Sequence, residues 1–206
     1  VGTKIYAVGG GWIPTHTVVE EYDTVTDTWT SKADMPTGRT RVEAVSVGGK
    51  VYAIGGHATS GWDTNAVEAY DPATNTWTAC AGMNTPRDSL EAVVVAGHIF
   101  ALGGMDGSTW LSSVEEYDPV ANIWTARDPM SAARDRFGAV SGNGVIYAFG
   151  GWNNGTQVNT SYAGTVPLGA NIIGCLWASV NPGVVGQWIE LRLTVTNTGG
   201  NDASGV

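Results

Sequence analysis

The sequence predicts an all-β fold built from a repeated four-stranded unit, and two sets of regularly spaced residues lead to that prediction. A glycine pair recurs at steps of 46, 48 and 47 residues, and each pair follows a short apolar segment: IYAVGG, VYAIGG, IFALGG and IYAFGG. The second set keeps its own register and consists of Tyr22, Tyr70 and Tyr117, then Trp29, Trp77 and Trp124, then Met35, Met83 and Met130, and finally Arg39, Arg87 and Arg134. Several residue types repeating at one period indicate stacked structural repeats.

Each unit is expected to contain four strands, as residues 88–128 illustrate. The apolar run 90–96 (LEAVVVA) is suited to a strand buried on both faces, and 99–102 is a second strand that ends at the glycine pair. Residues 114–118 form the third strand. The turn that follows begins with Asp118-Pro119, because Asp bonds nearby backbone N–H groups and Pro fixes φ. The outer strand then begins at residues 123–125.

The repeated residues have structural roles in this interpretation. Glycine is expected where a strand near a central axis meets a neighbouring backbone, because a β-carbon there would clash. The large Tyr and Trp rings are expected to fill the space between stacked, twisted sheets. The repeat residues to which these roles are assigned are Gly55, Gly56, Gly103, Gly104, Tyr70, Tyr117, Trp77 and Trp124.

The glycine pair, the Tyr-Asp, the Trp and the Met-x-x-x-Arg resemble the kelch family over residues 1–151. The resemblance implies a β-propeller of four-stranded antiparallel blades around an axis. The repeats divide into a partial blade at 1–33, full blades at 41–81 and 88–128, and a partial blade at 136–166, in which 157–166 is a degenerate third strand. About three to four blades form an incomplete propeller, so we expect either a fragment of a longer protein or self-association through the open ends.

After Pro167 the pattern changes. The stretch from residue 179 onward (SVNPGVVGQWIELRLTVTNTGG) resembles the opening of immunoglobulin-like repeats in bacterial and archaeal surface proteins. Residues 167–206 are therefore predicted to start a partial β-sandwich, of which only two or three strands are present. This resemblance implies a secreted or cell-surface protein.

Composition excludes some classes of partner. The 206 residues carry a formal charge of −9 and ten basic residues, which does not fit nucleic-acid binding. No stretch approaches the length of an apolar membrane span. Cys80 and Cys175 could pair in an oxidising compartment or remain free buried thiols.

The candidate ligand-binding residues lie in loops that one end of the propeller collects. Each loop after a glycine pair carries a tryptophan, namely Trp12, Trp62, Trp110 and Trp152. A Trp on such a face stacks on sugar rings or anchors a protein, and the competing interpretation is that it caps the end of its blade.

Charged residues of the same loops fall into three groups. For Arg39, Arg87 and Arg134 a structural ion pair or backbone contact is favoured. Arg41 and Arg136 break the repeat and are better placed to contact an anionic ligand. The aspartates that could bond ligand hydroxyls, or simply stabilise turns, are Asp63, Asp88 and Asp106.

These residues favour a non-catalytic module that binds a protein or glycan, with no cofactor and no metal. An alternative is a copper oxidase of the kelch type resembling galactose oxidase, which would need nitrogen ligands from His16, His57 or His98. No Cys lies in the loops of this face to build a crosslinked Tyr cofactor. A second alternative is an architectural spacer.

Overall fold

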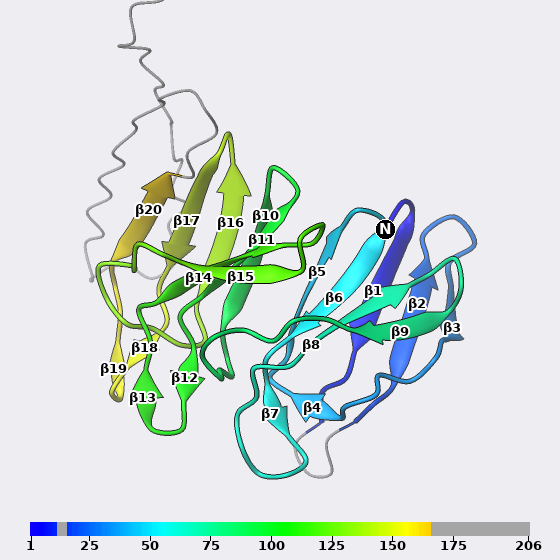
Figure 1. Ribbon diagram of the computed structural model, residues 1–206, viewed down its shortest axis with the longest axis horizontal. Coiled ribbons are helices and arrows are strands. Elements are labelled where there is room, and N and C mark those ends of the chain that lie inside the picture. Colours follow the sequence, from blue (N-terminus) through cyan, green and yellow to red (C-terminus); the bar gives the residue numbers. More distant parts are fainter. Residues whose placement is uncertain (12–15, 166–206) are drawn as a thin grey trace, which may run out of the picture.

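The computed structural model describes residues 1–11 and 16–165, and these residues form antiparallel β-sheets (Figure 1). The first large sheet contains β1 (Lys4–Val8), β2 (Val19–Asp23) and β3 (Thr28–Ser31). The second contains β5 (Glu43–Val47), β6 (Lys50–Ile54), β8 (Val67–Asp71) and β9 (Thr76–Ala79). The third contains β10 (Glu91–Val95), β11 (His98–Leu102), β14 (Val114–Asp118) and β15 (Ile123–Arg127), and the fourth contains β16 (Gly138–Gly142), β17 (Val145–Phe149) and β20 (Ser161–Thr165).

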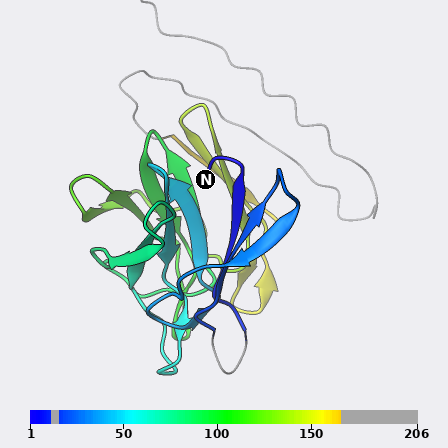
Figure 2. The same cartoon turned by 90° about the vertical axis from the view of Figure 1, so that its right-hand side faces the viewer.

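Within each large sheet the strands pair in chain order, so every sheet is a meander and forms one blade. The innermost strand β10 contacts β5 of the preceding blade and β16 of the following one, which places these strands nearest the common axis. Shorter pairs join β4 (Arg39–Thr40) to β7 (His57–Ala58), β12 (Met105–Asp106) to β13 (Thr109–Trp110), and β18 (Trp152–Asn153) to β19 (Thr156–Gln157). These short strands lie below the blades in Figures 1 and 2.

The predicted kelch-type arc is confirmed, with two differences of detail. The strand expected at residues 99–102 begins one residue earlier, at His98, which is the first residue of β11. Ala96 and Gly97 both have positive φ, 51° and 84°, so they alone form a tight two-residue hairpin turn. The second difference is the pair β12–β13, which occupies a segment expected to be loop. The strands predicted in residues 167–206 and the immunoglobulin-like assignment lie outside the described residues.

The hydrophobic core lies in layers between neighbouring blades. Ile54, Val67 and Tyr117 belong to the layer between the second and third blades, and Leu102 and Ile146 belong to the layer between the third and fourth. Because each blade packs only on its neighbours, the fold repeats one packing solution along the chain. Cys80 is a free, half-buried thiol beside the first of these layers, and Cys175 lies outside the described residues.

Glycine is required in these pairs for two reasons, the space around the α-carbon and the backbone φ. A β-carbon on Gly103 would lie 2.5 Å from the carbonyl oxygen of Arg134, and one on Gly104 would lie 2.5 Å from the carbonyl oxygen of Asp88. Both glycines also have positive φ, 56° and 89°, which L side chains adopt at a cost. The close approach expected from the sequence is therefore present, because Gly103 meets the segment that enters the next blade and Gly104 meets the segment that enters its own blade.

The Tyr and Trp of each outer strand do more than fill space. Trp124 donates its indole N–H to the carbonyl of Ala81 in the preceding blade, at 2.9 Å, and the N–H of Ala81 bonds Asn122 Oδ1 at 2.8 Å. Tyr117 also donates to Asn122 Oδ1, at 2.7 Å. The set Tyr70, Asn75 and Trp77 holds Ala33 in the same way. We call each set of three side chains an inter-blade clamp.

In the described part of the chain no helix is long and apolar enough to cross a membrane.

Candidate functional site at the loop edge

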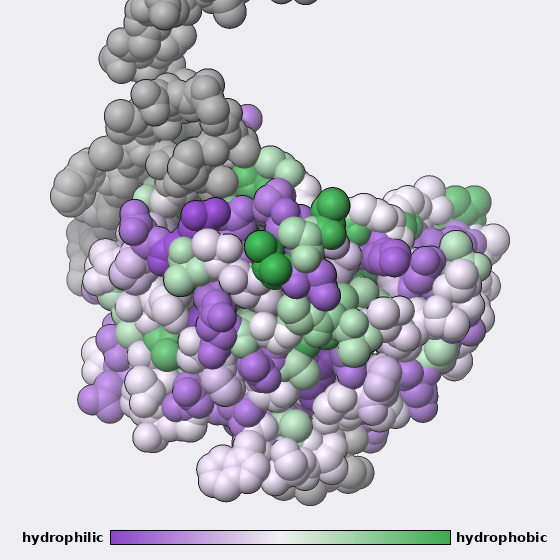
Figure 3. Space-filling model, in the orientation of Figure 1, coloured by the Kyte–Doolittle hydropathy of each residue, from purple (hydrophilic) through white to green (hydrophobic). Residues whose placement is uncertain are grey.

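We use the term loop edge for the end of the blades that carries the short strands, comprising residues 36–41, 57–65, 84–89, 105–112, 131–136 and 152–159. It runs along the bottom of Figure 1. In Figure 3 this lower edge shows mainly purple and near-white residues on the face in view, so its surface is largely polar.

Three fully buried arginines hold the loop edge to the blades. Arg87 donates to the carbonyls of Gly103 and Ser113 and pairs with Glu115 Oε1 at 2.6 Å. Arg39 repeats this arrangement with Glu68 at 2.7 Å. Burial lowers the pKa of Arg87, and the charge of Glu115 opposes that effect. These contacts support the structural interpretation of these arginines.

Arg134 occupies the third equivalent position with a different environment. It donates to the carbonyls of Gly150 and Thr160, and its ring partner is Phe137, whose centroid lies 5.9 Å from the guanidinium carbon. The strand register places Tyr162 where the other two blades have Glu. Desolvation therefore lowers the pKa of Arg134, and no carboxylate among the described residues opposes that effect.

Next to each blade junction stands a residue in the left-handed conformation. Arg41, Ser89 and Arg136 have φ values of 52°, 50° and 48°. The N–H of Ser89 bonds the carbonyl of Arg41 at 3.3 Å, and the N–H of Arg136 bonds the carbonyl of Ser89 at 3.0 Å. This chain of bonds links successive blades, and it places the two sequence-predicted arginines, Arg41 and Arg136, on either side of the junction that holds Ser89.

Arg136 and two tryptophans surround a buried aspartate. Asp135 is fully buried and accepts Arg136 Nε–H at 2.8 Å and the indole N–H of Trp110 at 3.2 Å. Its backbone pairs with that of Trp152. The Arg136 side chain remains 64% exposed and Trp152 is 40% exposed, so an oriented cation and an aromatic ring reach solvent together.

The four predicted tryptophans have different environments. Trp62 is 75% exposed at the tip of the loop that follows β7, while Trp110 is half-buried and bonded to Asp135. For Trp110 these contacts favour the capping interpretation. Trp12 lies outside the described residues. The binding roles of Trp62 and Trp152 stay predictions.

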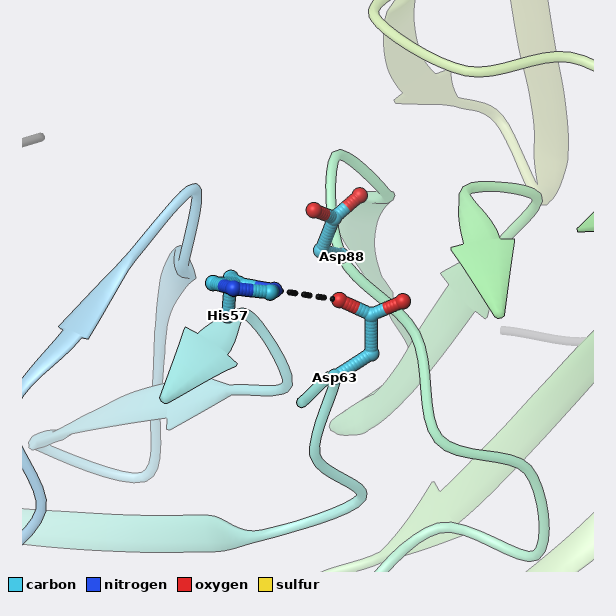
Figure 4. A group of neighbouring side chains, drawn as sticks. All are labelled: His57, Asp63 and Asp88. Atoms are coloured by element: carbon cyan, nitrogen blue, oxygen red, sulfur yellow. Dashed lines mark hydrogen bonds and ion pairs between the residues drawn. The ribbon is translucent and has the colours of Figure 1, made fainter. Parts of the chain in front are cut away.

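The predicted aspartates and histidines also lie in different environments. Asp63 and Asp88 approach His57 at the junction of the second and third blades (Figure 4), whereas Asp106 is exposed on the adjacent hairpin. His16 is exposed. His98 Nδ1 lies 2.7 Å from Glu116 Oε1 at the start of β11, away from the loop edge.

Sequence reasoning missed the acidic residues that organise this edge. Glu68 and Glu115 stand two residues before the repeated Tyr, and Asp135 follows Asp88 by the same 47-residue step. A search of the repeat for acidic residues in register would have found both sets. The approach of Asp63 to His57 has no such signal, because it depends on the path of one irregular loop.

Four antiparallel sheets stacked on their inner strands, with glycine pairs and buried arginines at each junction, define a kelch-repeat β-propeller arc. The chain belongs to the family described as the KLHDC2/KLHL20/DRC7 Kelch-repeats domain, whose model matches residues 1–151. Kelch-repeat propellers are a general kind of protein-binding module. No curated protein matches the chain.

Among solved structures, one titled "Structure of YjhT" superposes with a TM-score of 0.64 at 16% sequence identity. The alignment covers 73% of this chain and 56% of that one, so the chain spans little more than half the length of this neighbour. At this identity the likeness concerns the fold alone.

Proposed function

We propose that the protein is a non-catalytic recognition module that binds a protein ligand through the loop edge. The observation that carries this proposal is that Arg136 and Trp152 are both exposed and lie on segments joined by the backbone pair of Asp135 with Trp152. Asp135 fixes the Arg136 Nε, so the exposed end of the guanidinium is oriented before any ligand arrives. A preorganised arginine beside an aromatic ring is a favourable anchor, because little side-chain entropy is lost on binding.

The chemistry of this pair indicates the ligand that it would accept. An arginine fork matches a carboxylate, and Trp152 offers an apolar face next to it. We therefore expect the ligand to be a peptide segment in which an acidic residue stands close to an apolar one. A secreted or cell-surface location stays a prediction from the sequence.

The test is selection of a displayed random-peptide library on the purified chain, followed by binding measurements on the enriched peptides. We expect acidic peptides to be enriched and Arg136→Ala to weaken them about tenfold or more, as truncation at an interface anchor does. Arg127→Ala is the matched control, because Arg127 is also exposed but lies on β15. Failure to enrich any peptide, or equal losses in both variants, would contradict the proposal.

A glycan ligand is the second candidate, and the 75% exposure of Trp62 is what favours it. An exposed indole is a suitable platform for a sugar ring. A glycan array should then give a signal that Trp62→Ala removes and that Trp110→Ala, at a half-buried ring, leaves unchanged. Release of peroxide by copper-treated protein in the presence of galactose would contradict the non-catalytic part of the proposal.

A further inference from the structure

A cluster of three metal-ligating side chains lies at the junction between the second and third blades. His57 Nδ1 is 2.8 Å from Asp63 Oδ1, and the ligand atoms of His57, Asp63 and Asp88 all lie within 4.8 Å of one another (Figure 4). The three residues come from β7, from the loop after it and from the segment before β10. Asp88 is brought to His57 and Asp63 by the packing of the third blade against the second.

One buried oxygen in this cluster has no protein partner. Asp88 is 2% exposed, and its Oδ1 atom makes no hydrogen bond in the described structure. A buried carboxylate oxygen without a partner is costly, so such an atom points to a missing ligand. The equivalent residue one blade later, Asp135, is equally buried and has both oxygens bonded, to Trp110 and to Arg136. Of these two aspartates, only Asp88 has a side-chain oxygen without a partner among the described residues.

The other oxygen of each carboxylate is already held by a neighbour. Asp63 Oδ2 accepts the backbone N–H of Gly107 at 2.7 Å, and Asp88 Oδ2 accepts from Arg41 at 2.6 Å. Hydrogen bonds of this kind fix the orientation of metal-binding carboxylates in known sites. They leave one oxygen of each carboxylate to serve the cluster, and two carboxylates outweigh the single positive charge of Arg41.

We propose that His57, Asp63 and Asp88 form a site for a divalent first-row transition metal ion of the Zn²⁺ type. Such ions take imidazole nitrogen and carboxylate oxygen at about 2.0–2.1 Å, which separates tetrahedral ligands by roughly 3.4 Å. To reach this spacing the 2.8 Å separation of His57 and Asp63 must widen slightly, and the longer separations, which are at most 4.8 Å, must shorten. Three protein ligands leave the fourth tetrahedral position for a water molecule.

Binding requires one rearrangement of protons. The ion takes the lone pair of Nδ1 from the neutral imidazole, so the proton of the His57–Asp63 hydrogen bond moves to Nε2 or to solvent. The nitrogen ligand and the small number of oxygens distinguish this site from a Ca²⁺ site, which takes six to eight oxygens. The site is separate from Arg136 and Trp152, so the result of its test does not depend on the proposed function.

The experiment is calorimetric titration of the full chain, free of any affinity tag, with ZnCl₂, together with the thermal unfolding midpoint with and without Zn²⁺. His57→Gln is the deciding variant, because His57 is half-exposed and its replacement should leave the fold intact; Asp88→Asn is the second. We expect one Zn²⁺ per chain, a rise in the midpoint, and a loss of affinity of about tenfold or more in each variant.

Two control variants separate a built site from general attraction. His98→Gln removes another histidine that lies beside a carboxylate, and Asp106→Asn removes an exposed charge from the neighbouring hairpin. Both should bind Zn²⁺ like the unmodified chain. The proposal is overturned if no heat and no midpoint shift are seen, if His57→Gln binds unchanged, or if a control loses as much affinity as His57→Gln.

Discussion

Glu43 and Glu91 begin two neighbouring inner strands, β5 and β10, and the charge of Glu91 acts on the carboxyl group of Glu43. Burial raises the pKa of Glu43 to about 7, and the charge of Glu91 contributes to the same shift. Burial also raises the pKa of Glu91. Near neutral pH the inner face of the arc therefore holds carboxyl groups that bind protons more strongly folded than unfolded.

The sign of the linked stability follows from this shift. Because the folded state holds a proton on Glu43 that the unfolded state releases above its ordinary pKa, the free energy of unfolding falls as pH rises from about 4.5 to about 7. Glu43→Gln keeps a neutral side chain and should stabilise the protein by about 1–3 kcal/mol at pH 8 but very little at pH 4.5. Urea denaturation at both pH values measures this, and equal effects at both would contradict the pKa shift.

A buried ion pair and an exposed one stand on adjacent residues of β14. Glu115 pairs with fully buried Arg87 and also accepts bonds from Asn84, whereas Glu116 pairs with Arg127, which is 49% exposed. Glu115→Gln should cost about 3–5 kcal/mol of unfolding free energy, because it leaves a buried charge unpaired. Glu116→Gln should cost about 0–1 kcal/mol. Denaturant unfolding compares them, and similar losses would refute the assigned role of the Arg87 pair.

At the scale of elements, the inter-blade clamp explains why an Asn stands in the turns before the outer strands β9 and β15. Asn75 and Asn122 have φ values of 54° and 55°, which Asn tolerates better than most residues. Each uses its side-chain oxygen to accept bonds from its own blade and from the preceding one. One residue thus closes the turn and joins two blades.

The clamp leads to a prediction about Trp124. Trp124→Phe keeps an aromatic ring but removes the indole N–H that bonds the Ala81 carbonyl, so the unfolding free energy should fall by about 1–2 kcal/mol. Trp62→Phe, at an exposed loop position, should change it by less than about 0.5 kcal/mol. Chemical denaturation measures both, and an unchanged Trp124→Phe would show that the clamp bond contributes nothing net.

The repeat made most of the blades predictable from sequence, because their glycine pairs, Tyr, Trp and Arg keep a fixed step in the chain. The polar partners of those residues were not predicted, since Asn122 and Glu115 resemble ordinary surface residues in a sequence. The cluster of His57 with Asp63 and Asp88 was even harder to predict from the sequence. It depends on an irregular loop and on the packing of two blades, and neither leaves a periodic signal.

At the scale of the whole molecule, the first blade presents a face that the other blades bury. In the second blade Val51, Tyr70 and Trp77 stand in one row across the sheet, and the first two are almost fully buried against the first blade. The corresponding row in the first blade contains Ile5 and Trp29, which are 56% and 55% exposed in the described structure. This row repeats the chemistry of a blade-packing face.

Such a face should associate with another apolar surface when none of its own chain covers it. We expect the average mass of the purified chain, measured by light scattering, to rise with concentration. The double variant Ile5→Lys with Trp29→Ser should suppress this rise, because two charged or polar side chains interrupt the apolar row. Val120→Lys changes a 97% exposed apolar residue at a turn and should leave the rise in place. A chain that stays monomeric at every concentration would show that the exposed row is not sufficient to drive association. In that case the packing between blades in this arc depends on the clamps and the buried arginines more than on apolar area.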